Sequence, residues 1–364
     1  MASKFDFDPE VLDNLSEFYI TASTFRNAED FDVTKTTKLH APIFMAHGVD
    51  MGKQQNVSIA IHKNYADYDL KDLLSEIKVV SKLEHPNLLK FYENSISLPD
   101  KKIGFIYESH ACLLSEAFDN DVQIIYRPEV IKHVMKELFF ALSYLHNNGI
   151  VHRDIQPENI ALTNSCCVKI WNFWCAQTVG EPLVEMKVTD FRYQSVESIL
   201  VEGTAHPSLD IWSINVVFGE LWLKTSMFPV ADKEFPLAYI FALFGFPTKK
   251  VWEDFFKFDD VEKLCIYSAY EFNMLEVKFA REINRNIISP KGWDLLQKCF
   301  HYNPKERPTA EDCLRHPYFS EEPRTWGSVQ AVFFLEIICK LTDVCRAKSL
   351  IQKQIKCLNA VALM

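Results

Sequence analysis

The chain has 364 residues, which is long enough for two lobes that each bury a substantial core. Its formal net charge of −10 argues against a general nucleic-acid binder or a protein that lies on anionic membranes, because both need a basic face. The ten cysteines are scattered without a Cys-x-x-Cys pair, so we expect reduced thiols in a cytoplasmic or nuclear protein rather than a disulfide framework or a zinc site. The acidic start MASKFDFDPE does not resemble a signal peptide, and no uncharged run reaches the roughly 18 residues of a membrane span.

Residues 1–33 are predicted to form an acidic extension. Asp8-Pro9-Glu10 is typical of a helix start, since it supplies a capping oxygen, a proline in the first turn and an acid near the positive end of the helix dipole. The apolar residues that follow share one helical face: Val11, Leu12, Leu15, Phe18 and Tyr19. We expect this short amphipathic helix either to pack on its own domain or to bind a partner.

Residues 320–364 are predicted to form an amphipathic helical tail. Apolar residues recur with helical spacing from Val329 to Leu363. Glu336, Lys340 and Asp343 interrupt this pattern too often for a membrane span. The tail is expected either to pack on its own domain or to dock a partner or a membrane surface.

The most informative stretch is residues 151–174, which reads VHRDIQPENIALTNSCCVKIWNFW. Its segment His152–Asn159 closely resembles the catalytic loop of protein kinases. Further kinase signals stand in the family's order along the chain: Glu76, His85-Pro86-Asn87, Glu197, Asp210 and Arg307. Residues 228–252 and 301–319 are similar to the cyclin-dependent-kinase-like branch of the CMGC group.

This resemblance covers about residues 34–319 and implies an α+β, bilobal protein kinase fold. We expect a β-rich N-lobe at about 34–107, a helical C-lobe at about 111–319, and a cleft between them. Internal periodicity agrees, because it predicts helices over residues 69–83 and 130–147. ATP and Mg²⁺ are implied as cofactors by the family alone.

The resemblance implies an altered phosphate site in the N-lobe. Leu39–Phe44 stands where kinases have a glycine-rich loop, although side chains hinder close approach of backbone to phosphates. His62 replaces the phosphate-binding lysine, two residues after Ala60 of the adenine pocket. The neighbouring Lys63 should point to the other face of the strand, unless the register slips by one residue. Glu76 matches the glutamate that pairs with the missing lysine.

The rest of the adenine pocket is assigned in the same way. Tyr107 matches the gatekeeper, and Glu108 and His110 belong to the hinge between the lobes. Ala161 stands where the family has a leucine in the floor of the pocket, so the floor should be smaller.

The catalytic machinery is half retained. Asp154 matches the catalytic carboxylate and Asn159 the second metal ligand. Asn172 replaces the aspartate that holds Mg²⁺, and an amide brings no negative charge to a cation. Gln156 replaces the loop lysine, and Trp174 replaces a glycine beside the metal site.

Structural and regulatory residues are also implied by the resemblance. His152 and Phe173, with Val80, match the apolar stack that links the lobes. Glu197 and Arg307 match a buried ion pair.

The activation segment departs from the family. Arg153 is retained, but Ser75 and Gln177 replace two other basic residues that would receive a phosphothreonine. Glu185 falls at the phosphosite, where it either pairs with Arg153 or stays exposed. Asp190, which replaces a threonine, is expected to repel Asp154 or raise a pKa.

Two functions follow as hypotheses. The first is a pseudokinase that scaffolds or allosterically regulates a signalling partner, such as a kinase or a cyclin-like protein. The second is an atypical ATP-dependent Ser/Thr protein kinase that works through Lys63, Asn159 and Asn172.

Overall fold

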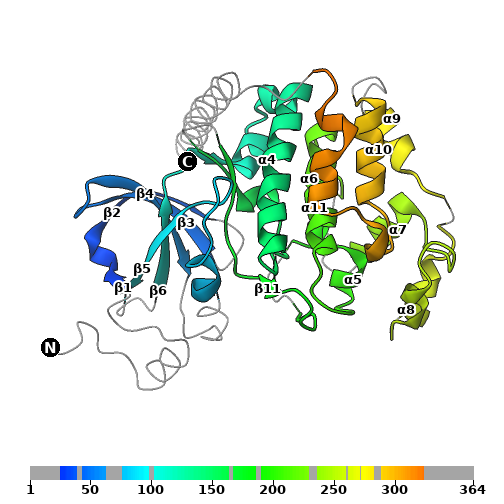
Figure 1. Ribbon diagram of the computed structural model, residues 1–364, viewed down its shortest axis with the longest axis horizontal. Helices are drawn as coiled ribbons and strands as arrows, with labels where there is room; N and C mark the ends of the chain where they lie inside the picture. Colours follow the sequence, from blue (N-terminus) through cyan, green and yellow to red (C-terminus); the bar gives the residue numbers. More distant parts are fainter. Residues whose placement is uncertain are drawn as a thin grey trace, which may run out of the picture.

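The computed structural model describes residues 25–38, 43–62, 76–97, 102–163, 167–185, 190–228, 236–259, 261–270, 272–282 and 288–323. They form two lobes, a β-sheet lobe in blue and cyan and a larger helical lobe in green to orange (Figure 1). The expected bilobal fold is therefore confirmed. The predicted N-terminal helix, the tail beyond Pro323, the segment Leu39–Pro42 and Lys63 lie outside the described residues.

The N-lobe is one twisted sheet with the strand order β1-β5-β6-β4-β3-β2. Its strands are β1 (Phe25–Asn27), β2 (Phe31–Lys38), β3 (Ile43–Asp50), β4 (Gln55–His62), β5 (Phe91–Ser97) and β6 (Lys102–Glu108). All neighbours are antiparallel except β1 and β5, which run parallel.

Strand β4 shows the two-residue alternation expected of a sheet with two different faces. Val57 and Ile59 pack in a small cluster on the outer face with Phe31, Ala46 and Ile106. Ala60 points the other way and joins the main core that continues into the C-lobe.

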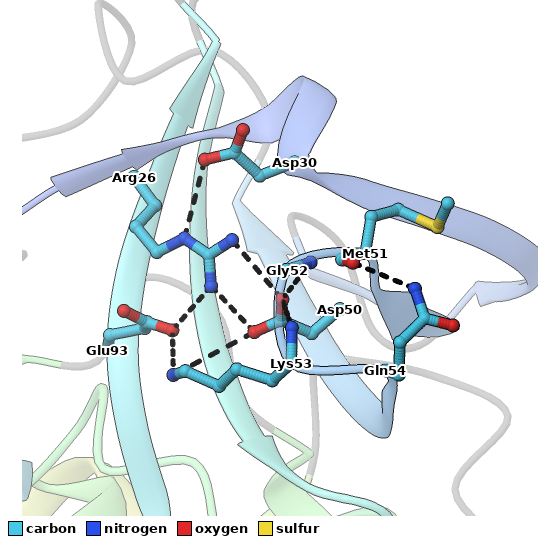
Figure 2. Close-up of polar contacts among 8 residues, drawn as sticks. All are labelled: Arg26, Asp30, Asp50, Met51, Gly52, Lys53, Gln54 and Glu93. Carbon is cyan, nitrogen blue, oxygen red and sulfur yellow. Dashed lines mark hydrogen bonds and ion pairs between the residues drawn. The ribbon is translucent and has the colours of Figure 1, made fainter.

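The sheet begins earlier than the expected boundary at residue 34. Strand β1 and the 3₁₀ turn η2 (Ala28–Asp30) belong to it, and β1 covers the edge of β5. Figure 2 shows how Arg26 secures this added strand. Its guanidinium donates to Asp50 at 2.6 Å and to Glu93 at 3.0 Å, and Lys53 bridges the same two carboxylates.

The C-lobe is built around α6 (Ser208–Leu223), every residue of which is buried. Its other helices are α3 (Leu114–Asp119), α4 (Pro128–Asn147), α5 (Val196–Ile199), α7 (Pro236–Phe244), α8 (Val261–Leu264), α9 (Leu275–Glu282), α10 (Pro290–Cys299) and α11 (Ala310–Arg315). The apolar periodicity that predicts a helix over 130–147 corresponds to α4, which begins two residues earlier at Pro128. None of the described helices is long and apolar enough to span a membrane.

The C-lobe also contains short strands and 3₁₀ turns. The strands are β7 (Cys112–Leu113), β8 (Ile150–Val151), β9 (Ile160–Leu162), β10 (Val168–Ile170) and β11 (Gln177–Thr178). The turns are η4 (Gln123–Tyr126), η5 (Pro157–Asn159), η6 (Phe191–Tyr193), η7 (Asp254–Lys257), η8 (Cys265–Tyr267), η9 (Pro304–Glu306) and η10 (Pro317–Phe319). Pairing of β9 with β10 brings residues 154–159 next to residues 171–173.

Candidate functional site

The loop that holds Asp154 is bound on its C-lobe side by Asp210, which lies in the first turn of α6. The Asp210 carboxylate accepts the backbone N–H groups of His152 at 2.9 Å and Arg153 at 2.8 Å, and the ring of His146 at 2.8 Å. Burial alone would raise the pKa of Asp210, but these donors and nearby histidines lower it. The loop is thus held by an ionised, fully buried carboxylate.

Asp154 lies at the centre of a closed hydrogen-bond network. Gln156 donates its Nε2 to Asp154 Oδ1 at 2.8 Å, and Asn159 donates its Nδ2 to Asp154 Oδ2 at 2.7 Å. Both Asp154 oxygens therefore already receive an amide N–H, and all three residues are buried. Gln156 does more than replace a lysine, because it binds the carboxylate directly.

Asn172, in the loop that follows β10, completes this network. Its Nδ2 donates to Asn159 Oδ1 at 3.0 Å, and its φ of 67° lies in the left-handed region that asparagine tolerates. The direction of this bond is fixed, because a carboxylate only accepts. Asn159 must turn its N–H toward Asp154, so its Oδ1 faces Asn172, which must in turn offer its own N–H.

The family implies a metal ion here, and the residues do not fit one. Mg²⁺ needs oxygen ligands, usually with one or two carboxylates. In this chain Asn159 Oδ1 is engaged by an amide, and residue 172 brings no charge. Within the described ranges no group of three or more His, Cys, Asp or Glu side chains is arranged to hold a metal.

Glu76 lies against the other side of residues 171–173. Its Oε1 accepts the backbone N–H of Phe173 at 3.1 Å, and burial raises the pKa of Glu76 to about 8. The side chain of His62 and the whole of Lys63 are outside the described part of the chain, so pairing of Glu76 with either stays a prediction.

The apolar stack between the lobes is formed. Phe173, His152 and Val80 are all buried, and the rings of His152 and Phe173 lie 5.1 Å apart. Burial lowers the pKa of His152, whose Nε2 donates to the Trp171 carbonyl at 3.1 Å. Trp174 is half-buried and packs against the same core.

Two backbone N–H groups of the hinge already donate hydrogen bonds within the protein. The N–H of His110 donates to Ser58 Oγ at 3.2 Å, and the same hydroxyl lies 2.8 Å from His110 Nδ1. The N–H of Ala111 donates to the Leu162 carbonyl at 2.8 Å. A purine entering the cleft would have to displace Ser58 to reach the His110 amide.

Three of the remaining pocket residues, Ala60, Tyr107 and Ala161, belong to the apolar core that spans both lobes. Ala60 and Ala161 are fully or almost fully buried. Tyr107 is also buried and meets the indole of Trp171 edge-on at 6.2 Å. Glu108 forms an ion pair of 2.8 Å with Lys169 of β10, which ties the hinge to the C-lobe.

In the activation segment, Glu185 takes the second of its two predicted positions, exposed to solvent. Arg153 does not pair with Glu185, which is exposed; it donates instead to the side chain of Gln177 and, at 2.5 Å, to the Val184 carbonyl. Asp190 is bound by Arg192, with N···O distances of 2.8 and 2.5 Å, and its effect on Asp154 stays a prediction.

The sequence names Gln177 but does not reveal its hydrogen bonds. It reads as the loss of a basic residue, yet its Oε1 accepts from Arg153 and its Nε2 donates to the Pro182 carbonyl at 3.0 Å. By contrast, the predicted pair of Glu197 and Arg307 is confirmed as a buried bidentate contact of 2.6 and 3.1 Å.

Comparison with known proteins agrees with this geometry. The protein kinase domain family matches residues 45–319. Cyclin-dependent kinase 11 of Dictyostelium discoideum is 31% identical over 258 residues, covering 68% of this chain and 68% of the relative. Cyclin-dependent kinase F-3 of rice is 29% identical over 248 residues, covering 68% of this chain and 55% of the relative.

Among solved structures, the yeast RNA polymerase II CTD kinase CTDK-1 complex contains a similar fold, with a TM-score of 0.71 and 22% identity. The match covers 84% of this chain and 97% of that chain. The matches to the mouse and human cyclin-dependent kinases 11B span only 31% of those relatives. The two lobes, the catalytic loop with its retained Asp154 and Asn159, and these matches together show that the chain belongs to the protein kinase domain family, in its cyclin-dependent-kinase-like branch.

Proposed function

We propose that this protein is a pseudokinase, a binding module that scaffolds or allosterically regulates a signalling partner. The observation that carries the proposal is the hydrogen bond from Asn172 Nδ2 to Asn159 Oδ1. It joins the two loops at Asn159 and Asn172, the residues that would hold a metal ion according to the family resemblance. The module therefore keeps a kinase-like cleft without a cation.

The electrostatic cost to phosphoryl transfer supports this proposal. Such transfer depends on positive charge that offsets the charge on the phosphates. Here Gln156, Asn172 and His62 replace charged groups, and Trp174 replaces a glycine. Loss of one preorganised charge-stabilising group costs roughly 2 to 4 kcal/mol, and the losses are not additive because these groups act together. Half of the summed cost would still remove most turnover.

The partner is proposed from the branch. The named relatives are cyclin-dependent kinases, so a cyclin-like protein is the first candidate. Co-purification of a cyclin-like protein from cells that express the full chain tests this part. Its absence from a stoichiometric complex would count against the cyclin, although not against the module.

A second function is favoured by two observations. Asp154 is retained. The residues of the apolar stack, His152, Phe173 and Val80, are all buried, as expected for a protein kinase that is active. An atypical Ser/Thr protein kinase, with phosphotransfer through Asp154, is therefore the alternative.

Thermal unfolding with nucleotide separates the two. A ligand that binds only the folded state stabilises that state and so raises the melting temperature. At a ligand concentration of 100 times its Kd, the stabilisation is about 2.7 kcal/mol. We expect no shift with millimolar ATP and Mg²⁺ or Mn²⁺. Phosphate transfer that disappears in Asp154→Ala would overturn the proposal and establish the kinase.

A further inference from the structure

A polar row of side chains crosses the N-lobe sheet next to the hinge. Ser58 of β4 is paired with His47 of β3 and with Tyr107 of β6. Residues two apart in one strand share a face of the sheet, and so do cross-strand partners. Ser58 and His47 therefore lie on the same face as Ala60, which belongs to the core shared by the two lobes. This face borders the space between the lobes.

The Ser58 hydroxyl makes two contacts with one hinge residue. Its Oγ accepts the backbone N–H of His110 at 3.2 Å and lies 2.8 Å from Nδ1 of the same histidine. Ser58 is fully buried, and His110 is only 3% exposed. A buried hydroxyl needs an acceptor for its hydrogen, and among the described residues Nδ1 is that acceptor. The imidazole of His110 is therefore neutral, with its proton on Nε2.

His47 packs against the other side of this imidazole. The ring centroids of His47 and His110 lie 4.7 Å apart, and the ring planes are inclined by 51°. Because Nδ1 and the backbone N–H of His110 meet the same hydroxyl, the ring is folded back toward its own main chain. A hydroxyl and two imidazoles thus lie beside the hinge amide.

The neighbouring hinge amides also donate within the chain. The N–H of Glu108 donates to the Lys90 carbonyl at 2.9 Å, and that of Ala111 donates to the Leu162 carbonyl at 2.8 Å. A purine is oriented in a cleft by a few well-placed polar groups, and its ring nitrogens need N–H donors. A purine could accept from the His110 N–H only after the Ser58 oxygen had left, because two acceptors cannot both lie along one N–H direction.

We propose that Ser58 is a specificity-determining residue that excludes purines from the cleft by acting as an internal ligand of the hinge. His110 receives the hydroxyl hydrogen, and His47 supports the folded imidazole. This inference rests on the proposed function and deepens it, because it concerns the end of the cleft that would hold a base rather than the end that would hold a metal ion.

The internal ligand has two advantages over a free purine. It is already part of the molecule, so its hydrogen bonds form without loss of translational and rotational freedom. Its displacement would also leave the buried Ser58 hydroxyl and His110 Nδ1 without their mutual hydrogen bond. Sites discriminate strongly against a ligand that leaves buried polar groups unpaired.

Calorimetric titration of the full chain with adenosine tests the role of Ser58. Adenosine has no phosphate and needs no cation, so the result does not depend on Asn159 or Asn172. We expect Ser58→Ala to bind adenosine at least about tenfold more tightly than the parent chain, which corresponds to about 1.4 kcal/mol. No gain in affinity, including no binding by either chain, would overturn the inference.

Two further variants show whether the hydroxyl itself is responsible. Ser58→Thr keeps a hydroxyl at this position and should bind adenosine several-fold less tightly than Ser58→Ala. Equal affinity of these two variants would reject the hydroxyl as the cause. Ser81→Ala is the matched control, because it removes an exposed hydroxyl that donates to the Lys78 carbonyl. Its affinity should equal that of the parent chain, and a gain like that of Ser58→Ala would count against a local effect.

Nitrogen NMR of the histidine rings tests the contact without a ligand. In the parent chain we expect His110 to carry its proton on Nε2, with the signal assigned by its loss in His110→Gln. Ser58→Ala should remove the shift that hydrogen bonding gives to Nδ1. If Ser58→Ala fails to fold in a melting experiment, the parent spectrum decides, and a proton on Nδ1 would reject the proposal.

These outcomes separate the role of Ser58 from the proposed function. Adenosine binding by the parent chain as tight as that of Ser58→Ala, without phosphate transfer, overturns the internal ligand and leaves the pseudokinase. A gain of adenosine binding in Ser58→Ala without transfer supports both. Phosphate transfer by Ser58→Ala that depends on Asp154 keeps the role of Ser58 but overturns a cleft without catalytic capacity.

Discussion

Asn172 has the clearest single-residue effect, because its amide N–H joins the loop after β10 to Asn159 of the catalytic loop. Its hydrogen bond to Asn159 Oδ1 is buried, and its own Oδ1 has no hydrogen-bond partner among the described residues. A buried oxygen without a partner carries a desolvation cost, so the arrangement depends on the N–H side of the amide.

Asn172→Asp reverses this dependence. The new carboxylate faces Asn159 Oδ1, so the variant should lose about 1 to 3 kcal/mol of stability in metal-free buffer. Millimolar Mg²⁺ should restore part of that loss, while the parent chain should not respond. Differential scanning calorimetry with and without Mg²⁺ measures both effects. Asn172→Leu is the control, since it loses the same bond but gains no ligand.

Glu76 predicts a pH dependence. Its folded pKa of about 8 lies above the ordinary value of 4.5, so the folded protein binds a proton there that the unfolded chain releases. The stabilisation is complete below about pH 4.5 and is lost as the pH rises through 8. Each pKa unit of difference between the folded and unfolded states corresponds to about 1.4 kcal/mol of stability. Glu76→Gln should flatten the fall in urea-unfolding free energy between pH 5 and 8, and an unchanged slope would contradict the assignment.

At the scale of elements, the added strand β1 is held mainly by charge. Arg26 joins it to the turn between β3 and β4 and to β5 through Asp50 and Glu93, as Figure 2 shows. The hydrogen bond from Arg26 and those from two backbone N–H groups hold the pKa of Asp50 below its usual range. The stability that ionised Asp50 contributes is present at neutral pH and is lost as the pH falls through the lowered pKa of this residue.

Arg26→Met should therefore cost about 2 kcal/mol, because it leaves the almost fully buried Asp50 carboxylate without its main partner. The loss should shrink in acid, once Asp50 is protonated. Lys53→Met is the matched control; this side chain is 55% exposed and should cost less than about 1 kcal/mol. Chemical denaturation at pH 7 and pH 3 compares the two, and similar losses would contradict a special role for Arg26.

The sequence predicted the elements much better than it predicted their contacts. Helix α4 and the catalytic loop carry strong periodic or ordered signals, and both stand where expected. Strand β1 has only three residues in an acidic stretch, and its pairing with β5 depends on residues some 67 positions away, as Arg26 and Glu93 illustrate. Such a strand exists because of tertiary pairing, not local propensity.

The site shows the same limit. Substitutions at positions 156, 172 and 177 are plain in the sequence, but each reads there only as a lost charge. Their gain appears only in space, where three amides bind Asp154, Asn159 and Arg153. A linear comparison detects what a side chain no longer does, whereas its new partner depends on the fold.

At the scale of the whole molecule, the two lobes share one apolar core that runs from Ala60 in β4 to Phe319 in η10. Lys169 adds a polar tie, since it reaches Glu108 at 2.8 Å from β10. The chain thus keeps the framework that sets the angle between the lobes, while the chemistry of the cleft has changed.

The covering of β5 by β1 matters for anyone who handles the protein. Trimming by a protease up to about residue 30 would bare a row of backbone amides and carbonyls on β5, and bare strand edges pair with one another. Oligomers found in a shortened preparation would then report damage at the amino end rather than a natural assembly, and the intact polypeptide is the proper material for measuring stoichiometry.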